Sequence, residues 1–156
     1  MLEIAKEKIK CCSFESGDEL WIVFDTDNDK LGSREHQINA VREECYRKKC
    51  WHYAESNPCF ELWLYYHLFS GKPDFEGCQI SKVWKSKLNE LIPGGFDSRK
   101  HSLLIDDAIE NAKSNYAVND ANRPDTGSTE LFKLGETIYK MMLDKIDRMR
   151  RDSTVL

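Results

Sequence analysis

The sequence predicts an α/β fold: a small parallel sheet flanked by helices, followed by a helical C-terminal half. Residues 20–24, LWIVF, form a continuous apolar run of strand length, as in strands that are covered on both faces. A second strand-like run, WHYAE at 51–55, follows a helical pattern. Strand, helix, strand in this order is a βαβ unit, whose two strands pair in parallel.

The bulk composition is that of one globular domain. The chain has 156 residues, of which 40% are hydrophobic and 32% charged, enough to bury a core without metal or disulfide staples. We expect a single domain over residues 1–156, with an α/β part at about 1–70 and a helical part at about 71–151. The apolar runs fall short of the roughly 20 residues of a membrane helix, and the N-terminus lacks a signal-peptide pattern. We therefore expect a cytoplasmic protein without a membrane span.

Helices are predicted on both sides of the first strand. Ser33 suits the N-cap of a helix that runs to about Lys49. The helix before the strand follows from apolar or small residues at helical spacing: Leu2, Ala5, Ile9 and Cys12. The inner face of the helix after the strand is predicted from the same spacing: Ile38, Val41 and Cys45.

The helical half begins after the second strand. Asn57 is a favoured N-cap and Pro58 suits a first helical position, so we expect a buried, almost wholly apolar helix from Pro58 to Phe69. Further helices are predicted over 80–92, 101–118 and 128–151. Only two strands are visible, and a two-stranded sheet cannot cover itself, so at least one strand is missing from this prediction.

Three aspartates, Asp25, Asp27 and Asp29, end the first strand. Ligands of parallel α/β sheets bind beyond the carboxyl ends of the strands, where these carboxylates lie. Mg²⁺ or Mn²⁺ bound directly by one carboxylate and through water by another fits this pattern. The alternative is an acidic turn, in which the aspartates only satisfy backbone groups.

Other interpretations of the aspartates fit less well. A calcium loop counted from Asp25 would require Gly and Glu where the chain has Lys30 and His36. An aspartate-nucleophile phosphatase, with LLIDD at 103–107 as its later acidic motif, and a sugar-nucleotide transferase are further alternatives. A zinc site is disfavoured because the spacing of its candidate ligands matches no common module: Cys45, Cys50, His52 and Cys59.

A second group of polar residues should meet the aspartates at the same edge of the sheet. Glu61 lies in an otherwise apolar helix, where an unpaired buried carboxylate would be costly and would need a cation. The alternative is an acid favoured by the helix dipole. Ser56, Asn57 and the adjacent helix amides are candidate substrate-binding groups, since helix N-termini bind phosphate. We expect His67 to be a hydrogen-bonded core residue.

Charge does not identify the partner. The net charge is −4, which does not by itself indicate a nucleic-acid-binding protein. A modest basic tip, DRMRR at 147–151, is more typical of a solvated helix face.

Two motifs carry a family resemblance. VFDTDND at 23–29 and SNPCFELWLYYHLF at 56–69, with DTGSTELFKL at 125–134, resemble the RloB-like family over roughly residues 15–150. That family is associated with restriction-modification loci and abortive-infection systems of bacteria and archaea. It is related to the Toprim nucleases.

The resemblance implies Mg²⁺-dependent cleavage of DNA or RNA phosphodiesters in anti-phage defence, with an ATPase partner of AAA or ABC type. Asp25 and Asp27 match the metal-binding DxD, and Glu61 is a candidate for part of the acid function. The family's N-terminal glutamate motif, EGxTE, is absent here. The sheet would then be an N-terminally incomplete Toprim sheet, and the rival function is a non-catalytic module that binds an ATPase or nucleic acid. The oligomeric state stays open.

Overall fold

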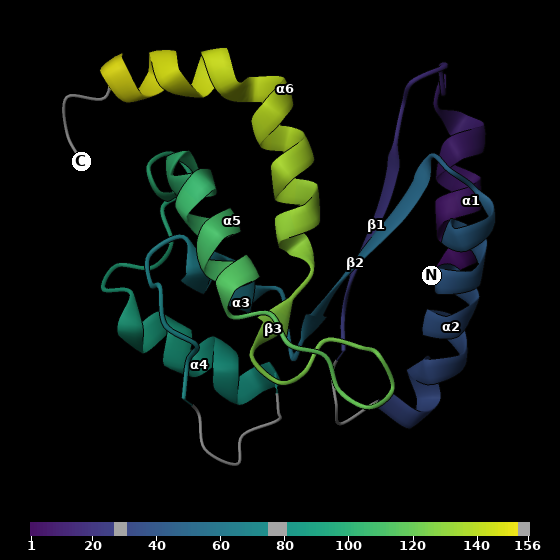
Figure 1. Ribbon diagram of the computed structural model, residues 1–156, viewed down its shortest axis with the longest axis horizontal. Helices are drawn as coiled ribbons and strands as arrows, with labels where there is room; N and C mark the ends of the chain where they lie inside the picture. Colours follow the sequence, from purple (N-terminus) through teal and green to yellow (C-terminus); the bar gives the residue numbers. More distant parts are fainter. Residues whose placement is uncertain (27–30, 75–80, 153–156) are drawn as a thin grey trace.

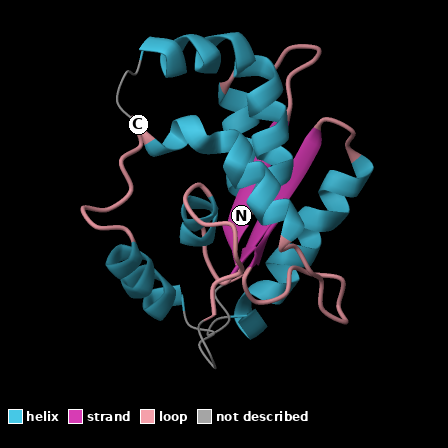
Figure 2. Ribbon diagram, turned by 60° about the vertical axis from the view of Figure 1, so that its left-hand side comes forward, coloured by secondary structure: helices cyan, strands magenta, loops and turns pink. Residues whose placement is uncertain are grey.

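The computed structural model describes residues 1–26, 31–74 and 81–152, with the backbone alone at 31–33 and 81. Its strands lie between two groups of helices, as Figures 1 and 2 both show. The elements in chain order are α1 (Leu2–Cys11), β1 (Leu20–Asp25), α2 (Leu31–Arg47), β2 (Trp51–Asn57), α3 (Glu61–Tyr66), α4 (Ser81–Leu91), the 3-10 helix η2 (His101–Leu104), α5 (Ile105–Ser114), β3 (Ser128–Thr129) and α6 (Leu131–Asp152).

The predicted α/β class and the parallel pairing of the first two strands are confirmed. β1 and β2 pair in register from Leu20 opposite Trp51 to Asp25 opposite Ser56. Each face of this pair has its own core. Ile22 and Phe24 pack with Ile38 of α2, whereas Ala54 packs with the helical half. The face of β1 that carries Ile22 and Phe24 is buried, but Val23 on the other face is 41% exposed, so the prediction that both faces of this strand are covered is wrong at Val23.

A third strand, β3, lies inside the segment that the sequence predicts as the start of the last helix. Ser128 and Thr129 pair antiparallel with Asn57 and Ser56, and α6 begins only at Leu131. Both hydroxyl-bearing residues are buried. A strand of two residues has no periodicity, which is why the pattern of the sequence did not predict it.

The helix expected over Pro58–Phe69 is shorter than predicted, and Asn57 does not cap it. Asn57 is the last residue of β2, and its Nδ2 donates a hydrogen bond of 2.8 Å to the carbonyl of Pro124. Helix α3 spans Glu61–Tyr66, with Phe60 at its N-cap. Pairing with β3 keeps Asn57 extended, and this tertiary contact overrides the local capping signal.

Two other helix boundaries also differ from the prediction. α2 begins at Leu31, so Ser33 lies inside the helix and not at its cap. The segment 101–118 starts with a 3-10 turn and its α-helix ends at Ser114. None of the described helices is long and apolar enough to cross a lipid bilayer.

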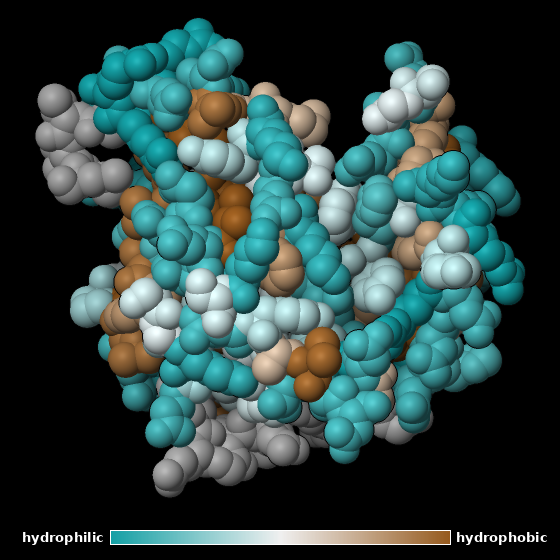
Figure 3. All heavy atoms as spheres, viewed as in Figure 1, coloured by the Kyte–Doolittle hydropathy of each residue, from teal (hydrophilic) through white to brown (hydrophobic). Residues whose placement is uncertain are grey.

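An apolar cleft of about 810 Å³ separates α6 from α1 and the start of β1. It opens at the top of Figure 3, where hydrophilic side chains otherwise cover most of the visible face. Ile9 and Trp21 line one side, and Leu134, Ile138 and Met141 of α6 line the other.

Candidate active site

The parallel register brings Asp25 and the segment after β2 to the same edge of the sheet. Asp25 is the last residue of β1 and lies opposite Ser56. The next residue, Thr26, extends the ladder through its backbone amide, which donates a 2.8 Å hydrogen bond to the carbonyl of Ser56. Asp25 itself is half-buried at this edge.

Glu61 opens α3, five residues after Ser56. Its Oε1 lies 3.3 Å from the Nζ of Lys85 in α4. Its Oε2 is buried and has no hydrogen-bond partner among the described atoms. A buried carboxylate oxygen without a partner is costly, so this atom has an unmet need for a donor or a cation.

The charges of this edge act on one another. Burial alone would lower the pKa of Lys85, but Glu61, with contributions from Asp25 and Cys59, raises it above its ordinary value. The ammonium group is therefore charged at neutral pH. The side chain of Lys85 is 48% exposed, so this charge also faces solvent.

Cys59 lies beneath these carboxylates and is fully buried. Burial raises the pKa of its thiol strongly, and the neighbouring charges of Glu61 and Asp25 raise it further. The thiol stays protonated at neutral pH, and an S–H group is a much weaker donor to a carboxylate than an N–H group or a cation. It is therefore neither a nucleophile nor a thiolate ligand for a metal.

The two predicted substrate-binding side chains are engaged by the protein. The hydroxyl groups of Ser56 and Thr129 are 2.7 Å apart, and Asn57 holds the carbonyl of Pro124. We also predicted that the amides of a helix starting at Pro58 would bind phosphate beside Asn57. In the described structure α3 begins only at Glu61, so these amides are not next to Asn57. Ser56 and Asn57 therefore anchor the 124–129 segment to β2.

Two of the three predicted metal ligands, Asp27 and Asp29, lie outside the described residues. Within the described ranges, no three His, Cys, Asp or Glu side chains are placed to hold a metal ion together. Asp25 and Glu61 remain as candidate oxygen ligands at this edge of the sheet. The Oε2 of Glu61, which has no hydrogen-bond partner among the described atoms, fits a hard cation such as Mg²⁺ or Mn²⁺.

A buried ion pair that the sequence did not predict lies directly behind the edge. The guanidinium of Arg123 binds the carboxylate of Glu55, with an Nε–Oε1 distance of 3.1 Å. Thr26 donates a hydrogen bond of 2.9 Å to the same oxygen. The sequence indicates Glu55 only as a strand residue, and no local pattern links it to Arg123.

Glu130 completes the edge of β2 beyond the short β3. Its backbone amide donates to the carbonyl of Glu55 at 2.8 Å, and its Oε2 accepts a 3.2 Å hydrogen bond from the amide of Glu55. Its Oε1 accepts hydrogen bonds from Tyr116 at 3.2 Å and Lys133 at 2.6 Å. Burial raises the pKa of Tyr116, and the charge of Glu130 adds to this.

The family of this chain is shown by comparison with known proteins. A family model described as RloB-like protein matches residues 1–138. The chain belongs to the RloB-like family. The resemblance that the sequence motifs predicted is thereby confirmed. No curated protein and no solved structure matches this RloB-like chain.

Proposed function

We propose that this RloB-like protein is a metal-dependent nuclease that cleaves DNA or RNA phosphodiesters at the edge formed by Asp25 and Glu61. The observation that carries the proposal is the buried Oε2 of Glu61, which has no hydrogen-bond partner among the described atoms. A binding site for a divalent cation would satisfy this oxygen, and the approach of Asp25 supplies a second carboxylate.

The side chains of this edge would have two roles, cation binding and phosphate binding. Asp25 and Glu61 would hold the cation, together with Asp27 and Asp29 of the adjoining segment. When bound, Mg²⁺ or Mn²⁺ would supply positive charge to the phosphate and a more acidic water. Lys85, charged and half-exposed, is suited to hold a phosphate oxygen and to balance the carboxylates.

The cellular setting belongs to the same proposal. We infer a role in defence against phage, together with an ATPase partner of AAA or ABC type, in the cytoplasm. The resemblance of both sequence motifs to RloB-like and Toprim-related proteins supports this setting.

A second candidate is a non-catalytic module that binds an ATPase or nucleic acid. One observation favours it: Lys85 already gives Glu61 a cationic neighbour. In this alternative the Glu61–Lys85 pair would be structural.

Metal titration of the full chain separates the two candidates. Mg²⁺ or Mn²⁺ at about 100 times its Kd should stabilise the protein by about 2.7 kcal/mol, which raises the melting temperature by roughly 5–11 °C at about 2–4 °C per kcal/mol. Asp25→Asn and Glu61→Gln should lose this rise, and both should lose cleavage of single-stranded and duplex substrates. Glu136→Gln, which changes a carboxylate paired with Lys113 on the surface, should retain both. Equal melting and equal cleavage in all four proteins would refute the nuclease.

A further inference from the structure

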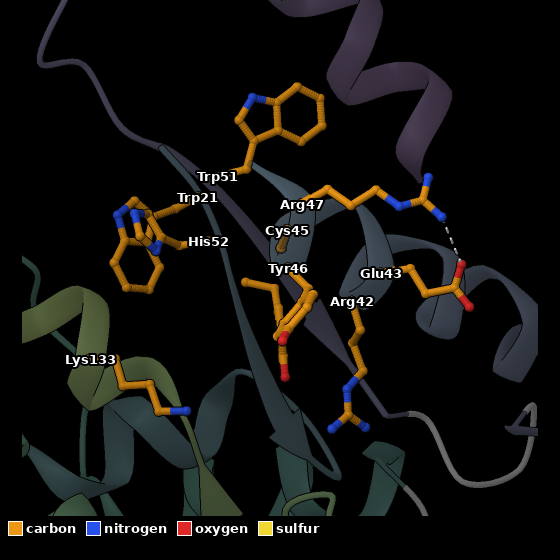
Figure 4. A pocket seen from close by; sticks show the side chains of 10 residues that line it. Trp21, Arg42, Glu43, Cys45, Tyr46, Arg47, Trp51, His52 and Lys133 are labelled. Carbon is orange, nitrogen blue, oxygen red and sulfur yellow. Dashed lines mark ion pairs between the residues drawn. The ribbon is translucent and has the colours of Figure 1, made fainter. Parts of the chain in front are cut away.

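A second pocket, of about 710 Å³, lies at the opposite end of β2 from Asp25 and is drawn in Figure 4. Residues from four elements line it: β1, α2, β2 and α6. Figure 4 shows Trp21 and His52 on one side of β2, with Lys133 below them, and Tyr46 and Arg42 on the other side of the strand. The proposed catalytic edge does not use any of these side chains.

Aromatic rings form the apolar part of this pocket. The rings of Trp21 and His52 stack with their centroids 4.8 Å apart and 28° between their planes. Trp21 is fixed by a 3.0 Å hydrogen bond from its Nε1 to Glu19. Across the pocket, Tyr46 is 95% exposed, so its ring is not used in packing the protein. The pocket therefore combines a fixed aromatic stack with a free ring.

The charged lining residues are mainly cationic. Arg42, Arg47 and Lys133 line the pocket together with the carboxylate of Glu43. Lys133 is paired with Glu130 at 2.6 Å, so its charge is already balanced and the two arginines remain for a ligand. Arg42 donates to the carbonyl of Asn122 at 3.1 Å, a contact that leaves its charge unneutralised. Arg47 lies 3.7 Å from Glu43 and 3.8 Å from Glu44, and its own side chain is 69% exposed, so these ion pairs cost little to break.

We propose that this pocket binds a nucleotide of a single-stranded nucleic acid, with its base against Tyr46 and His52 and its phosphates against Arg42 and Arg47. Aromatic rings beside cations are the elements with which proteins bind single strands, because every base has a stacking face and every linkage a charge. A duplex keeps its bases stacked on each other and would leave Tyr46 unused. The proposal rests on the proposed nuclease function in that it names the substrate of the same protein.

The position of the pocket also suits a strand that reaches the catalytic edge. His52 and Ser56 are four residues apart on β2, which corresponds to about 13 Å along the strand. β3 pairs only with Ser56 and Asn57, so in the described structure it does not cover β2 between Trp51 and Ala54. An extended chain can therefore approach the pocket from this side.

Binding is best measured without cleavage, by fluorescence anisotropy of a labelled oligothymidine of about 12 nucleotides, a length within the range of single-strand sites, in buffer with EDTA. Tyr46→Ser should weaken binding roughly tenfold, the loss of one stacking contact. Arg47→Gln should weaken it and lower the slope of log K against log salt by about 0.7. Matched controls outside the pocket, Met141→Ser and Arg99→Gln, also change exposed side chains and should bind as the unchanged protein does.

Competing ligands distinguish a single strand from the other ligands that this pocket could take. Unchanged affinity in both Tyr46→Ser and Arg47→Gln, or no binding by the unchanged protein, overturns the proposal. Equal competition by a polyglutamate peptide would instead indicate a groove for acidic peptides, and equal affinity for thymidine monophosphate would indicate a free nucleotide. Asp25→Asn separates this proposal from the nuclease, because it should bind oligothymidine normally while losing cleavage.

Discussion

Arg123 and Glu55 form an ion pair in which the two side chains are only 9% and 1% exposed, although they are 68 residues apart in the chain. The pair joins β2 to the loop before β3. Thr26 satisfies the same carboxylate, so residues from three parts of the chain meet in one buried polar group. Such a network is costly when only one partner is removed.

Removal of one member of this pair should therefore destabilise the fold. We expect Arg123→Ala to lower the free energy of unfolding by roughly 3–5 kcal/mol, because it leaves the Glu55 carboxylate buried without its cation. Urea denaturation followed by circular dichroism measures this change. Lys113→Ala, which breaks an exposed ion pair with Glu136, is the control and should cost no more than about 1 kcal/mol. If Arg123→Ala lowered the free energy of unfolding by no more than Lys113→Ala does, the Arg123–Glu55 pair would not be buried as described.

His67 should make stability dependent on pH in the mildly acidic range. Burial lowers its pKa below the ordinary value of 6.5, although its hydrogen bond to the carbonyl of Trp63 acts in the opposite direction. Between the folded-state and unfolded-state pKa values, the unfolded chain binds the extra proton. The stability that neutral His67 contributes is therefore fully present above the unfolded-state pKa and is lost as the pH falls toward the folded-state pKa.

The measurement is the free energy of unfolding from about pH 7.5 down to about pH 5, the range in which histidine titrates. His67→Gln should show a shallower decline with acidification than the unchanged protein. His36→Gln, at an exposed position of α2, should show the unchanged slope. If the free energy of unfolding declined equally with falling pH in all three proteins, His67 would not be the group that makes stability depend on pH.

Thiol labelling should distinguish Cys59 from the exposed cysteines. Its burial and raised pKa leave almost no accessible thiolate, so we expect iodoacetamide at about pH 8 to leave Cys59 unmodified in the native protein. Cys11, Cys12 and Cys50 are exposed and should react. Peptide mass spectrometry after timed labelling gives the result, and labelling in urea should include Cys59. If Cys59 in the native protein were labelled as fast as Cys50, the thiol beneath Asp25 and Glu61 would be accessible to solvent and the predicted burial would be wrong.

Arg150 should hold the last turns of α6 against α5. Its side chain forms an ion pair with Asp106, and its Nε donates a 3.0 Å hydrogen bond to the carbonyl of Leu103. Arg150→Ala should speed amide hydrogen exchange over 146–152 and cost about 1 kcal/mol, since the pair is partly exposed. Arg148→Ala is the control in the same helix, because Arg148 bonds only within α6 among the described contacts. Equal exchange in the two variants would contradict the role of Arg150.

The sequence predicted best where the signal is local. The apolar run of β1 and the pattern of α2 identified the parallel pair, although Val23 in that run is exposed. At Asn57 the same local reasoning was wrong, because its conformation is decided by hydrogen bonds with Pro124 and Gly127, far along the chain. Parallel pairing was enough to predict that Asp25 would share an edge with the segment after β2.

The remaining parts of the site depend on distant contacts. Lys85 is one of several lysines on an amphipathic helix, and only packing of α4 against α3 brings it to Glu61. Arg123 lies in a polar loop, where its charge gives no sign of burial. The roles of Asp27 and Asp29 remain predictions, because both residues lie outside the described structure.

β3 has a consequence for the way the molecule unfolds. Its two residues lie within the helical half in sequence, between α5 and α6, but complete the sheet of the first half, and Glu130 bonds with the backbone of Glu55 just beyond them. A fragment that ends near residue 115 would lack β3, Glu130 and Arg123. Glu55 would then lose its cation, and β2 would lose its third strand. The two halves should therefore melt as one cooperative unit, and neither should be obtainable as a stable fragment.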